Sequence, residues 1–341
     1  GVRPFYASQL KDADPEILSY GIQYLTIVCV CSFGIYAQLI FEKLLQSTGK
    51  TLYSMITQAV GAVINIILDP ILIFGLLGMP KLGVAGAAIA TVIGQIVGGT
   101  LGFWFNIRKN KEITLSIKGF RPDGATIANI YKVGVPAIIM QAIGSVMTYG
   151  MNMILITFSS TATAVFGVYF KLQSFFFMPV FGLNNGLIPI VAYNYGAGKR
   201  SRLVKAIKCS LVYAFALLFV GFIVFQTVPA ALLGMFEASE EMLAIGVPAL
   251  HIIGIHFLAA WFCIIAGSVF QALGNGVYSL VVSVARQLVV LLPVAYILAQ
   301  LGGLNAVWWS FPIAEMMSLC VSALFMIRIH KKVISKVPDN Q

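Results

Sequence analysis

The sequence predicts an all-α membrane protein, a polytopic helical bundle with two pseudo-symmetric lobes. Hydrophobic residues make up 59% of the chain and charged residues only 10%, with a mean hydropathy of +0.92, whereas about a quarter of the residues of a soluble domain are charged. A helix needs about 20 apolar residues to cross the hydrocarbon core of a membrane. Runs without Asp, Glu, Lys or Arg cover residues 20–41, 82–107, 133–170, 172–198, 209–236, 242–285 and 287–314.

An internal repeat predicts the two lobes. The pattern Gln-x-x-Gly followed by Tyr-Ser occurs at 46–54 and again at 271–279, at one offset (271 − 46 = 225). Farther along, residues 83–95 align with residues 303–315 at a similar offset (303 − 83 = 220). Many membrane transporters are built from repeats, and their substrate sites lie where the repeats face each other. The repeat therefore favours a transporter.

The uncharged runs divide into nine helical spans. Glycine-rich segments such as Gly78-Met79-Pro80 and Gly302-Gly303 separate them, because glycine allows turns that helix interiors disfavour. A transmembrane β-barrel would need alternating segments of about 10 residues instead, so that class is excluded. The spans are expected at about 19–44, 51–78, 83–107, 127–157, 162–194, 203–234, 242–272, 277–300 and 304–330.

The basic residues predict a membrane orientation rather than a nucleic-acid partner. The net charge is +10, but if the spans alternate, fifteen Lys and Arg residues fall on one side and three on the other. An excess of Lys and Arg marks the cytoplasmic side. We therefore expect a multi-pass protein of the plasma membrane, with its N-terminus outside and its C-terminus cytoplasmic. The fifteen are Lys50, Arg108, Lys109, Lys111, Lys118, Arg121, Lys199, Arg200, Arg202, Lys205, Lys208, Arg328, Lys331, Lys332 and Lys336, and the three are Arg3, Lys11 and Lys81.

A polar pocket is predicted in the second span, around Asp69. A charged side chain at membrane depth costs about 2.5 to 3.5 kcal/mol, so it needs a reason to be there. Asn65 lies one helical turn before Asp69 on the same face, and Pro70 deprives the Ile66 carbonyl of its donor, which predicts a helix kink. These oxygen atoms suit a desolvated cation such as Na+ or a proton. The alternative is a packing helix whose aspartate bonds to a neighbouring polar group.

Other ionisable residues at membrane depth leave two readings open. Glu42 either pairs with a neighbouring base such as Lys43 or has a functional role. Glu315 follows a proline and aligns with the neutral Gln95. It is either a functional acid or a side chain that forms a polar contact between two helices. Arg286 either reaches the cytoplasmic headgroups or pairs with an acid such as Glu315.

Lys171 lies in the fifth span among aromatic and methionine side chains, including Tyr169 and Met178. Such side chains, together with a few polar groups, can line an adaptable pocket for bulky apolar ligands. The alternative is packing against lipid or other helices.

Three motifs carry a family resemblance. Residues 65–75 read Asn-x-x-x-Asp-Pro-Ile-Leu-Ile-Phe-Gly, residues 83–91 read Gly-Val-Ala-Gly-Ala-Ala-x-Ala-Thr, and residues 189–199 end in Tyr-Asn-Tyr-Gly-Ala-Gly-Lys. Together they resemble the multidrug and toxic compound extrusion (MATE) transporters, over essentially the whole chain. The resemblance implies two six-helix bundles that face each other across a central cavity.

The resemblance also implies a domain organisation. Twelve spans are expected and nine are visible, so three further spans are expected in front of Gly1. The chain would then comprise a partial N-terminal lobe with three transmembrane helices (1–107), a cytoplasmic connector (108–126) and a C-terminal lobe with six transmembrane helices (127–341).

The implied function is secondary active efflux of amphipathic, often cationic, compounds in antiport with Na+ or H+. Asn65, Asp69 and Thr91 match the family's N-lobe site for the coupling cation or proton, although the aspartate that the family carries on its first span is absent. We expect a monomer that binds a small-molecule substrate and the lipid bilayer, with no cofactor besides the coupling ion. The substrate-cavity candidates are Tyr169, Lys171, Gln173, Met178, Gln141, Asn152 and Glu315.

Three other function classes fit the sequence less well. A receptor or channel would need neither the repeat between the two halves nor the acidic helix with its proline. The chain contains no Walker loop, GxSxG or HExxH motif, so it is not expected to be an enzyme. A flippase for lipid-linked oligosaccharides, from a related two-lobe family, is the alternative transporter. Its cavity would need several Arg and Lys side chains for the pyrophosphate, and only Lys171 and Arg286 qualify.

Overall fold

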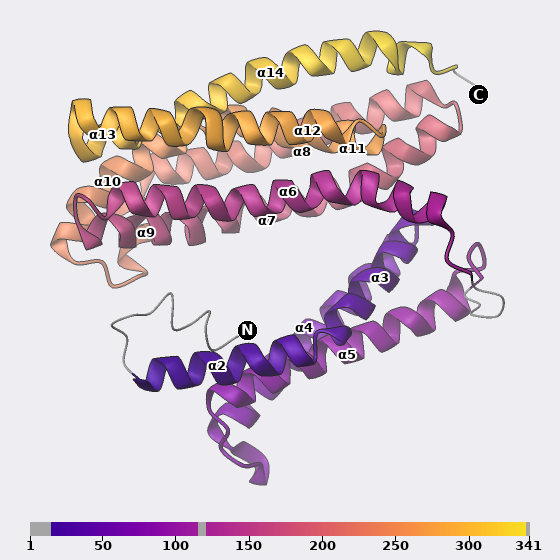
Figure 1. Ribbon diagram of the computed structural model, residues 1–341, viewed down its shortest axis with the longest axis horizontal. Coiled ribbons are helices and arrows are strands. Elements are labelled where there is room, and N and C mark those ends of the chain that lie inside the picture. The colour runs from indigo at the N-terminus through magenta and orange to yellow at the C-terminus, as the bar shows by residue number, and fades with distance from the viewer. Residues whose placement is uncertain (1–14, 115–120, 339–341) are drawn as a thin grey trace. The chain divides into compact units, whose positions relative to one another are not determined.

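The computed structural model describes residues 15–114 and 121–338, and all the regular secondary structure in them is helical (Figure 1). The predicted all-α class is therefore confirmed. The chain divides into two compact units, Gly1–Arg121 and Pro122–Gln341, and the division falls inside the segment predicted as a connector. Arg3, Lys11 and Lys118, on which the predicted orientation partly relies, lie outside the described residues.

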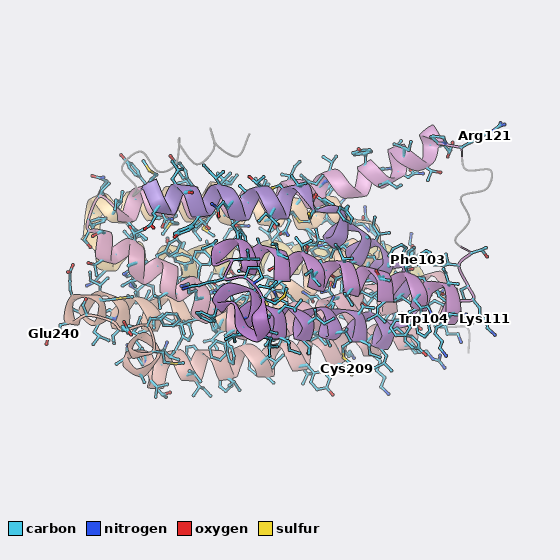
Figure 2. The ribbon with its side chains drawn as sticks, turned by 90° about the horizontal axis from the view of Figure 1, so that it is seen from below. Phe103, Trp104, Lys111, Arg121, Cys209 and Glu240 are labelled. Carbon is cyan, nitrogen blue, oxygen red and sulfur yellow. The ribbon has the colours of Figure 1, made fainter. Side chains whose placement is uncertain are left out.

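The described part of the N-terminal unit consists of four long helices and a short 3-10 turn. Helix α5 is its centre, because α2, α3 and α4 all pack on it. The Asn106 side chain links α5 to α3, because it donates a hydrogen bond to the carbonyl oxygen of Phe41 (2.9 Å). Near the same end of α5, the aromatic side chains of Phe103 and Trp104 are exposed, and Lys111 follows the helix (Figure 2). Trp and basic residues are both frequent where a helix leaves the membrane. The elements are α2 (Pro15–Val30), α3 (Phe33–Ser47), α4 (Thr51–Phe74), η1 (Leu76–Gly78) and α5 (Val84–Lys109).

The C-terminal unit is a larger helical bundle around an aromatic core. Trp308, Tyr169, Phe166, Phe225 and Phe257 are among its fully buried side chains. Its elements are α6 (Gly124–Leu155), α7 (Ser160–Gly196), α8 (Arg200–Thr227), α9 (Pro229–Gly234), α10 (Glu240–Gly254), α11 (Phe257–Ala272), α12 (Gly276–Val284), the π-helix η2 (Ala285–Leu291), α13 (Leu292–Val307), α14 (Ser310–Lys332) and η3 (Ile334–Lys336).

Side-chain caps begin three helices of this unit. The side chains of Asp123, Ser159 and Ser239 accept hydrogen bonds from backbone N–H groups in the first turns of α6, α7 and α10. These groups have no partner inside the helix, so a polar residue just before it is favoured. The Thr126 hydroxyl, together with the N–H groups of Thr126 and Ala125, lowers the pKa of the exposed Asp123 carboxyl.

The described helices agree with the nine predicted spans. Seven are long and apolar enough to cross a membrane, and two bent pairs raise the number to nine if each pair is one span. The pairs are Leu18–Val30 with Phe33–Ser47, bent by 48°, and Glu240–Gly254 with Phe257–Ala272, bent by 52°. The sixth predicted span differs, because α8 ends at Thr227 and Pro229 begins the separate helix α9.

The repeat seen in the sequence has the same backbone conformation in both units. Gly49 and Gly274, paired by the offset of 225, have φ angles of 76° and 75°. The N–H of Gly49 bonds to the Gln46 carbonyl and that of Gly274 to the Gln271 carbonyl, both at 3.0 Å. A left-handed glycine that ends a helix in this way is a common C-terminal cap. The two segments therefore share their turn geometry as well as their sequence.

A pair of aromatic contacts extends this correspondence to the following helices. Tyr53 packs on Phe105 with ring centroids 4.8 Å apart, and Tyr278 packs on Phe325 at 4.5 Å. The tyrosines are related by the first offset (278 − 53 = 225) and the phenylalanines by the second (325 − 105 = 220). Equivalent residues thus make equivalent contacts in the two units.

Helices α4 and α5 approach each other closely where Gly61 meets Gly94. A Cβ atom added to Gly94 would lie 2.6 Å from the Gly61 carbonyl oxygen, and one added to Gly61 would lie 2.9 Å from the Gly94 carbonyl oxygen. Small residues at helix contacts let backbones approach in lipid, where no hydrophobic force brings helices together. The contact therefore requires glycine at both positions.

We predict that Gly94→Ala destabilises the protein by about 1 to 3 kcal/mol, because the added methyl group must push α4 and α5 apart. The melting temperature of the purified protein in detergent measures the effect. Gly182→Ala in α7 is the matched control, because nothing lies within 4 Å of the added Cβ, and it should not lower the melting temperature. Equal melting temperatures for Gly94→Ala and the wild type would contradict the packing argument.

Candidate functional site

The three residues predicted to bind the coupling ion lie together in the N-terminal unit. The Asn65 amide nitrogen lies 3.2 Å from Asp69 Oδ1 and 3.4 Å from Thr91 Oγ1, and donates a hydrogen bond to each. The Thr91 hydroxyl donates in turn to the Ala87 carbonyl oxygen (2.9 Å). All three side chains are half-buried. The site thus joins α4 to α5 through one amide.

Local sequence explains how α4 presents these groups. Asn65 and Asp69 are four residues apart, which places them on one helix face. Helix α4 runs as one helix through Pro70 to Phe74, and Pro70 provides no N–H for the Ile66 carbonyl. The helix ends at Gly75, whose φ of 76° is the left-handed conformation that favours glycine.

The site contains the kind of oxygen atoms that a hard cation prefers: a carboxylate, an amide carbonyl and a hydroxyl. Among the described residues, no group of three or more His, Cys, Asp or Glu side chains could hold a metal ion. Na+ at Asp69 would therefore rely on this one carboxylate, with Asn65 and Thr91 as neutral ligands. The same carboxylate can instead carry a proton.

A second acid of this unit, Glu42, is almost completely buried, with 2% of its surface exposed. Its Oε1 accepts hydrogen bonds from Gln38 (2.9 Å) and Thr57 (3.2 Å), and its Oε2 accepts one from Gln58 (2.7 Å). Three neutral donors thus surround this carboxylate. The sequence proposed a basic partner such as Lys43 as one option, whereas the donors come from a turn earlier in α3 and from α4.

The C-terminal unit contains an ion pair between a half-buried arginine, whose side chain is 34% exposed, and a buried glutamate. Arg286 Nη1 lies 2.9 Å from Glu315 Oε2, and the Glu315 side chain is 3% exposed. Of the two readings left open for Arg286, the structure shows the pairing with Glu315. Arg286 belongs to the π-helix η2 and Glu315 to α14, two elements in contact. The ion pair therefore connects the last two spans.

Two cavities in this unit share the ion pair. The larger, of about 420 Å³, is lined by Gln141 together with Arg286 and Glu315. The smaller, of about 280 Å³, is lined by Tyr169 and Gln173 as well as the ion pair. The structure thus brings four of the seven predicted cavity residues to one pair of cavities.

The remaining three predicted cavity residues lie elsewhere in the same unit. Lys171 is exposed, and its Nζ lies 5.7 Å from the centre of the Phe236 ring, a cation–π contact. Met178 is 69% exposed, and Asn152 is half-buried near the end of α6.

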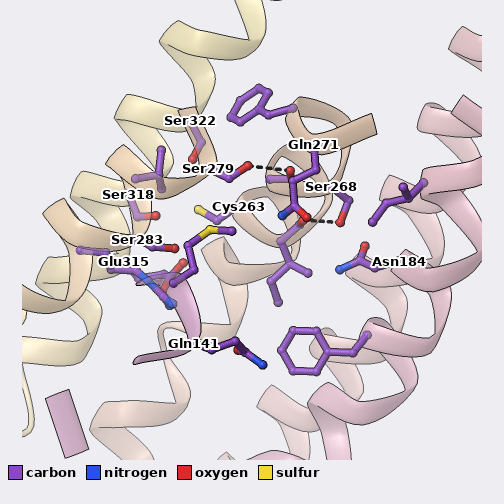
Figure 3. Close-up of a pocket in the computed structure, with 18 of the residues that line it drawn as sticks. Gln141, Asn184, Cys263, Ser268, Gln271, Ser279, Ser283, Glu315, Ser318 and Ser322 are labelled. Carbon is purple, nitrogen blue, oxygen red and sulfur yellow. Dashed lines mark hydrogen bonds and ion pairs between the residues drawn. The ribbon is translucent and has the colours of Figure 1, made fainter. Parts of the chain in front are cut away.

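Sequence reasoning missed most of the polar lining of the larger cavity. Five serines contribute hydroxyls, and Asn184 contributes an amide from α7 (Figure 3). Each serine alone is unremarkable in an apolar span. The spacing of four residues between Ser279 and Ser283, and again between Ser318 and Ser322, was the available signal, because it places each pair on one helix face.

Comparison with known proteins identifies the family. The sequence profile of the MatE family matches residues 4–71 and 136–297. The multidrug export protein MepA of Staphylococcus haemolyticus is 30% identical over 303 residues, 89% of this chain and 66% of that protein. MepA of Staphylococcus saprophyticus is 31% identical over 329 residues, 94% of this chain and 69% of that protein. The chain belongs to the MATE family.

Solved structures show the same fold for this MATE chain. A MOP superfamily transporter from Pyrococcus furiosus has a TM-score of 0.89 at 23% identity, with 98% of this chain and 74% of that chain covered. An outward-facing multidrug resistance MATE family transporter has a TM-score of 0.87 at 23% identity, with 98% and 75% covered. The predicted two-lobe helical fold is thus confirmed. MATE proteins are transporters, so the expectation that the chain is not an enzyme is also confirmed. The chain spans about two thirds of the length of the curated relatives.

We predict that Arg286→Gln lowers the free energy of unfolding by about 3 kcal/mol, because it leaves the Glu315 charge buried without its partner. The neutral double variant Arg286→Gln/Glu315→Gln should recover most of this loss, since neither charge remains. Melting temperatures in detergent give the ranking, and Arg202→Gln on the exposed face of α8 serves as the control. A double variant less stable than Arg286→Gln would show that the pair is not the source of the effect.

Proposed function

We propose that this chain forms part of a multidrug efflux transporter that exports amphipathic, often cationic, compounds in exchange for Na+ or H+. One observation carries the coupling: Asp69, Asn65 and Thr91 converge from two neighbouring helices at membrane depth. The substrate class is supported by relatives that are named multidrug export proteins. The proposed location is the plasma membrane, with the C-terminus in the cytoplasm.

The coupling site can act as a switch because ion binding changes its hydrogen bonds. When Asp69 is ionised, the Asn65 amide donates to it and to the Thr91 hydroxyl. A cation would instead attract the carbonyl oxygen of Asn65, and a proton would turn one Asp69 oxygen into a donor. Either change favours rotation of the Asn65 amide, and this amide is the group that links α4 to Thr91 on α5.

The α4–α5 link has one hydrogen-bond pattern with the ion bound and another without it. Antiport follows if these two patterns favour opposite orientations of the transporter, one open to the cytoplasm and one open to the outside. Substrate binds while the cavity faces the cytoplasm, and an ion that reaches Asp69 from outside favours the state that releases it. A ligand that binds both states equally shifts nothing. The ion must therefore bind more tightly to the orientation that releases the substrate. Pro70 offers a place where α4 can bend between the two orientations.

The structure gives little support to the flippase alternative. A pyrophosphate carries several negative charges and would need a surplus of basic side chains in the cavity, and the two candidates do not supply one. Arg286 is bound to Glu315, and Lys171 lies over the Phe236 ring. Efflux of organic cations is the better match, because it needs no cationic cavity.

We predict that Asp69→Asn lowers gradient-driven efflux by about tenfold or more, because an amide can hold neither a proton nor a compensating charge for Na+. The assay follows ethidium in vesicles that contain the intact transporter, with a pH gradient and a Na+ gradient imposed separately. Whichever of the two gradients drives ethidium efflux identifies the coupling ion.

Asp123→Asn is the matched control for this experiment. Asp123 is an exposed aspartate at the start of α6, and asparagine also caps helices well, so efflux should persist. Unchanged efflux by Asp69→Asn at normal expression would remove Asp69 from the mechanism.

A further inference from the structure

The ion pair between Arg286 and Glu315 leaves several hydrogen-bonding positions of both side chains unused. Arg286 and Glu315 meet through a single contact, Nη1 to Oε2. The other carboxylate oxygen, Glu315 Oε1, is buried without a hydrogen-bond partner, and a guanidinium carries five N–H donors. An unpartnered charged oxygen in a low-dielectric interior is costly. The pair therefore offers both an acceptor and donors to a molecule in the adjoining cavity.

Further unpartnered polar atoms line the same cavity of about 420 Å³. Asn184 Oδ1, Ser318 Oγ and Ser322 Oγ are buried and make no hydrogen bond. Figure 3 shows Glu315, Ser318 and Ser283 on one side of the cavity and Asn184 on the other. Buried polar atoms are almost always satisfied in native proteins. Four such atoms around one cavity indicate that a polar ligand completes their bonding.

Comparison of the two repeats shows which side chain is missing from this cavity. Gly267 lines it and corresponds to Glu42 of the N-terminal unit (267 − 42 = 225). In that unit the Glu42 carboxylate occupies this sequence position and accepts three hydrogen bonds. A Cβ added to Gly267 would meet only Ser279 Oγ, at 3.9 Å. The C-terminal unit thus has no side chain at the position of Glu42, and the space beside Gly267 is open.

The basic partner for an external carboxylate is also specific to this unit. Arg286 corresponds to Gly61 (286 − 61 = 225), so the N-terminal unit has no guanidinium at this position. Glu315 corresponds to the neutral Gln95 (315 − 95 = 220). The cavity therefore combines one cationic and one anionic side chain with hydroxyls and amides, and the charges of its ion pair cancel.

We infer that this cavity is a binding site for a small zwitterion that carries a carboxylate and an ammonium group. The carboxylate bonds to the free N–H donors of Arg286 and to serine hydroxyls, and the ammonium donates to Glu315 Oε1 and Asn184 Oδ1. Charge-assisted hydrogen bonds of this kind are about twice as strong as neutral ones. The volume lies within the usual range for small-molecule sites. Bulky apolar cations match this lining poorly, so Gln141 and Glu315, which the sequence predicted as drug-cavity residues, are assigned here to a second class of ligand.

L-Glutamine is the probe, because it has both charged groups and an amide of its own. The intact transporter is purified in lipid nanodiscs without any ion gradient, and binding is followed by isotherms with radiolabelled ligand. Two competitors each lack one group: glutaramate has no ammonium, and γ-aminobutyramide has no carboxylate. We expect glutamine to compete at concentrations about tenfold or more below either analogue, since each lost charge-assisted contact weakens binding. No binding, or equal competition by all three compounds, would overturn the inference.

Two variants locate the binding. Gly267→Leu fills the cavity without changing a charge and should weaken glutamine binding by about tenfold or more. Gly167→Leu is its matched control, because nothing lies within 4 Å of the added Cβ on α7, and binding should be retained. Unchanged affinity in Gly267→Leu would contradict the site.

The neutral double variant Arg286→Gln/Glu315→Gln tests the charges in a form without an unpaired buried ion. It should abolish the preference for glutamine over the two analogues. A preference retained in this variant would overturn the proposed roles of Arg286 and Glu315. Since binding is measured without a gradient, its outcome is independent of whether Asp69 couples ions.

Discussion

The close approach of α4 and α5 is the contact on which the N-terminal site depends. Gly61 and Gly94 allow the two backbones to meet, and the position of a Cβ on Gly94 lies only 3.4 Å from the Cβ of Asn65. Asn65 follows Gly61 by one helical turn, so the contact that joins the helices also brings its amide within reach of Thr91. In lipid, helix association rests on packing and interhelical hydrogen bonds. Glycines therefore set the position of the site, and the polar side chains set its chemistry.

The C-terminal unit places different chemistry on the equivalent backbone. Arg286 and Glu315 occupy the positions of Gly61 and Gln95, and a long ion pair needs more room between helices than two glycines do. The π-helix Ala285–Leu291 contains Arg286, whereas α4 is α-helical at the equivalent position. π-helical turns are rare and occur mostly at functional sites. The wider turn and the cavity beside it are thus consistent with a site that has diverged after duplication.

The sequence predicts local features of this protein well and tertiary partners poorly. Long apolar runs and glycine-rich turns are local signals, so the nine spans agree with the described helices, and the spacing of four residues places Asn65 beside Asp69. Thr91 lies on another helix, and only the family resemblance pointed to it. Arg286 and Glu315 are 29 residues apart, and their pairing depends on how η2 packs on α14. Spacing along one helix cannot specify such a contact, which explains why the sequence left two readings of Arg286 open.

The two units do not duplicate the proposed ion site. Where the N-terminal unit has Asn65 and Asp69, the corresponding stretch of the C-terminal unit, residues 288–295, contains only apolar side chains, and at the offset of 220 Thr91 corresponds to Phe311. Apolar side chains provide no oxygen ligand and carry no proton, so the coupling chemistry proposed for Asp69 has no counterpart at these positions. The ion pair beside the polar cavity is found in the C-terminal unit, and the N-terminal unit has Gly61 and Gln95 at the corresponding positions. A ligand in one unit can then influence a ligand in the other only through conformational states that both units share. The proposed alternating access would provide such states, and it would allow one duplicated scaffold to separate the proposed ion coupling from recognition of a second class of molecule.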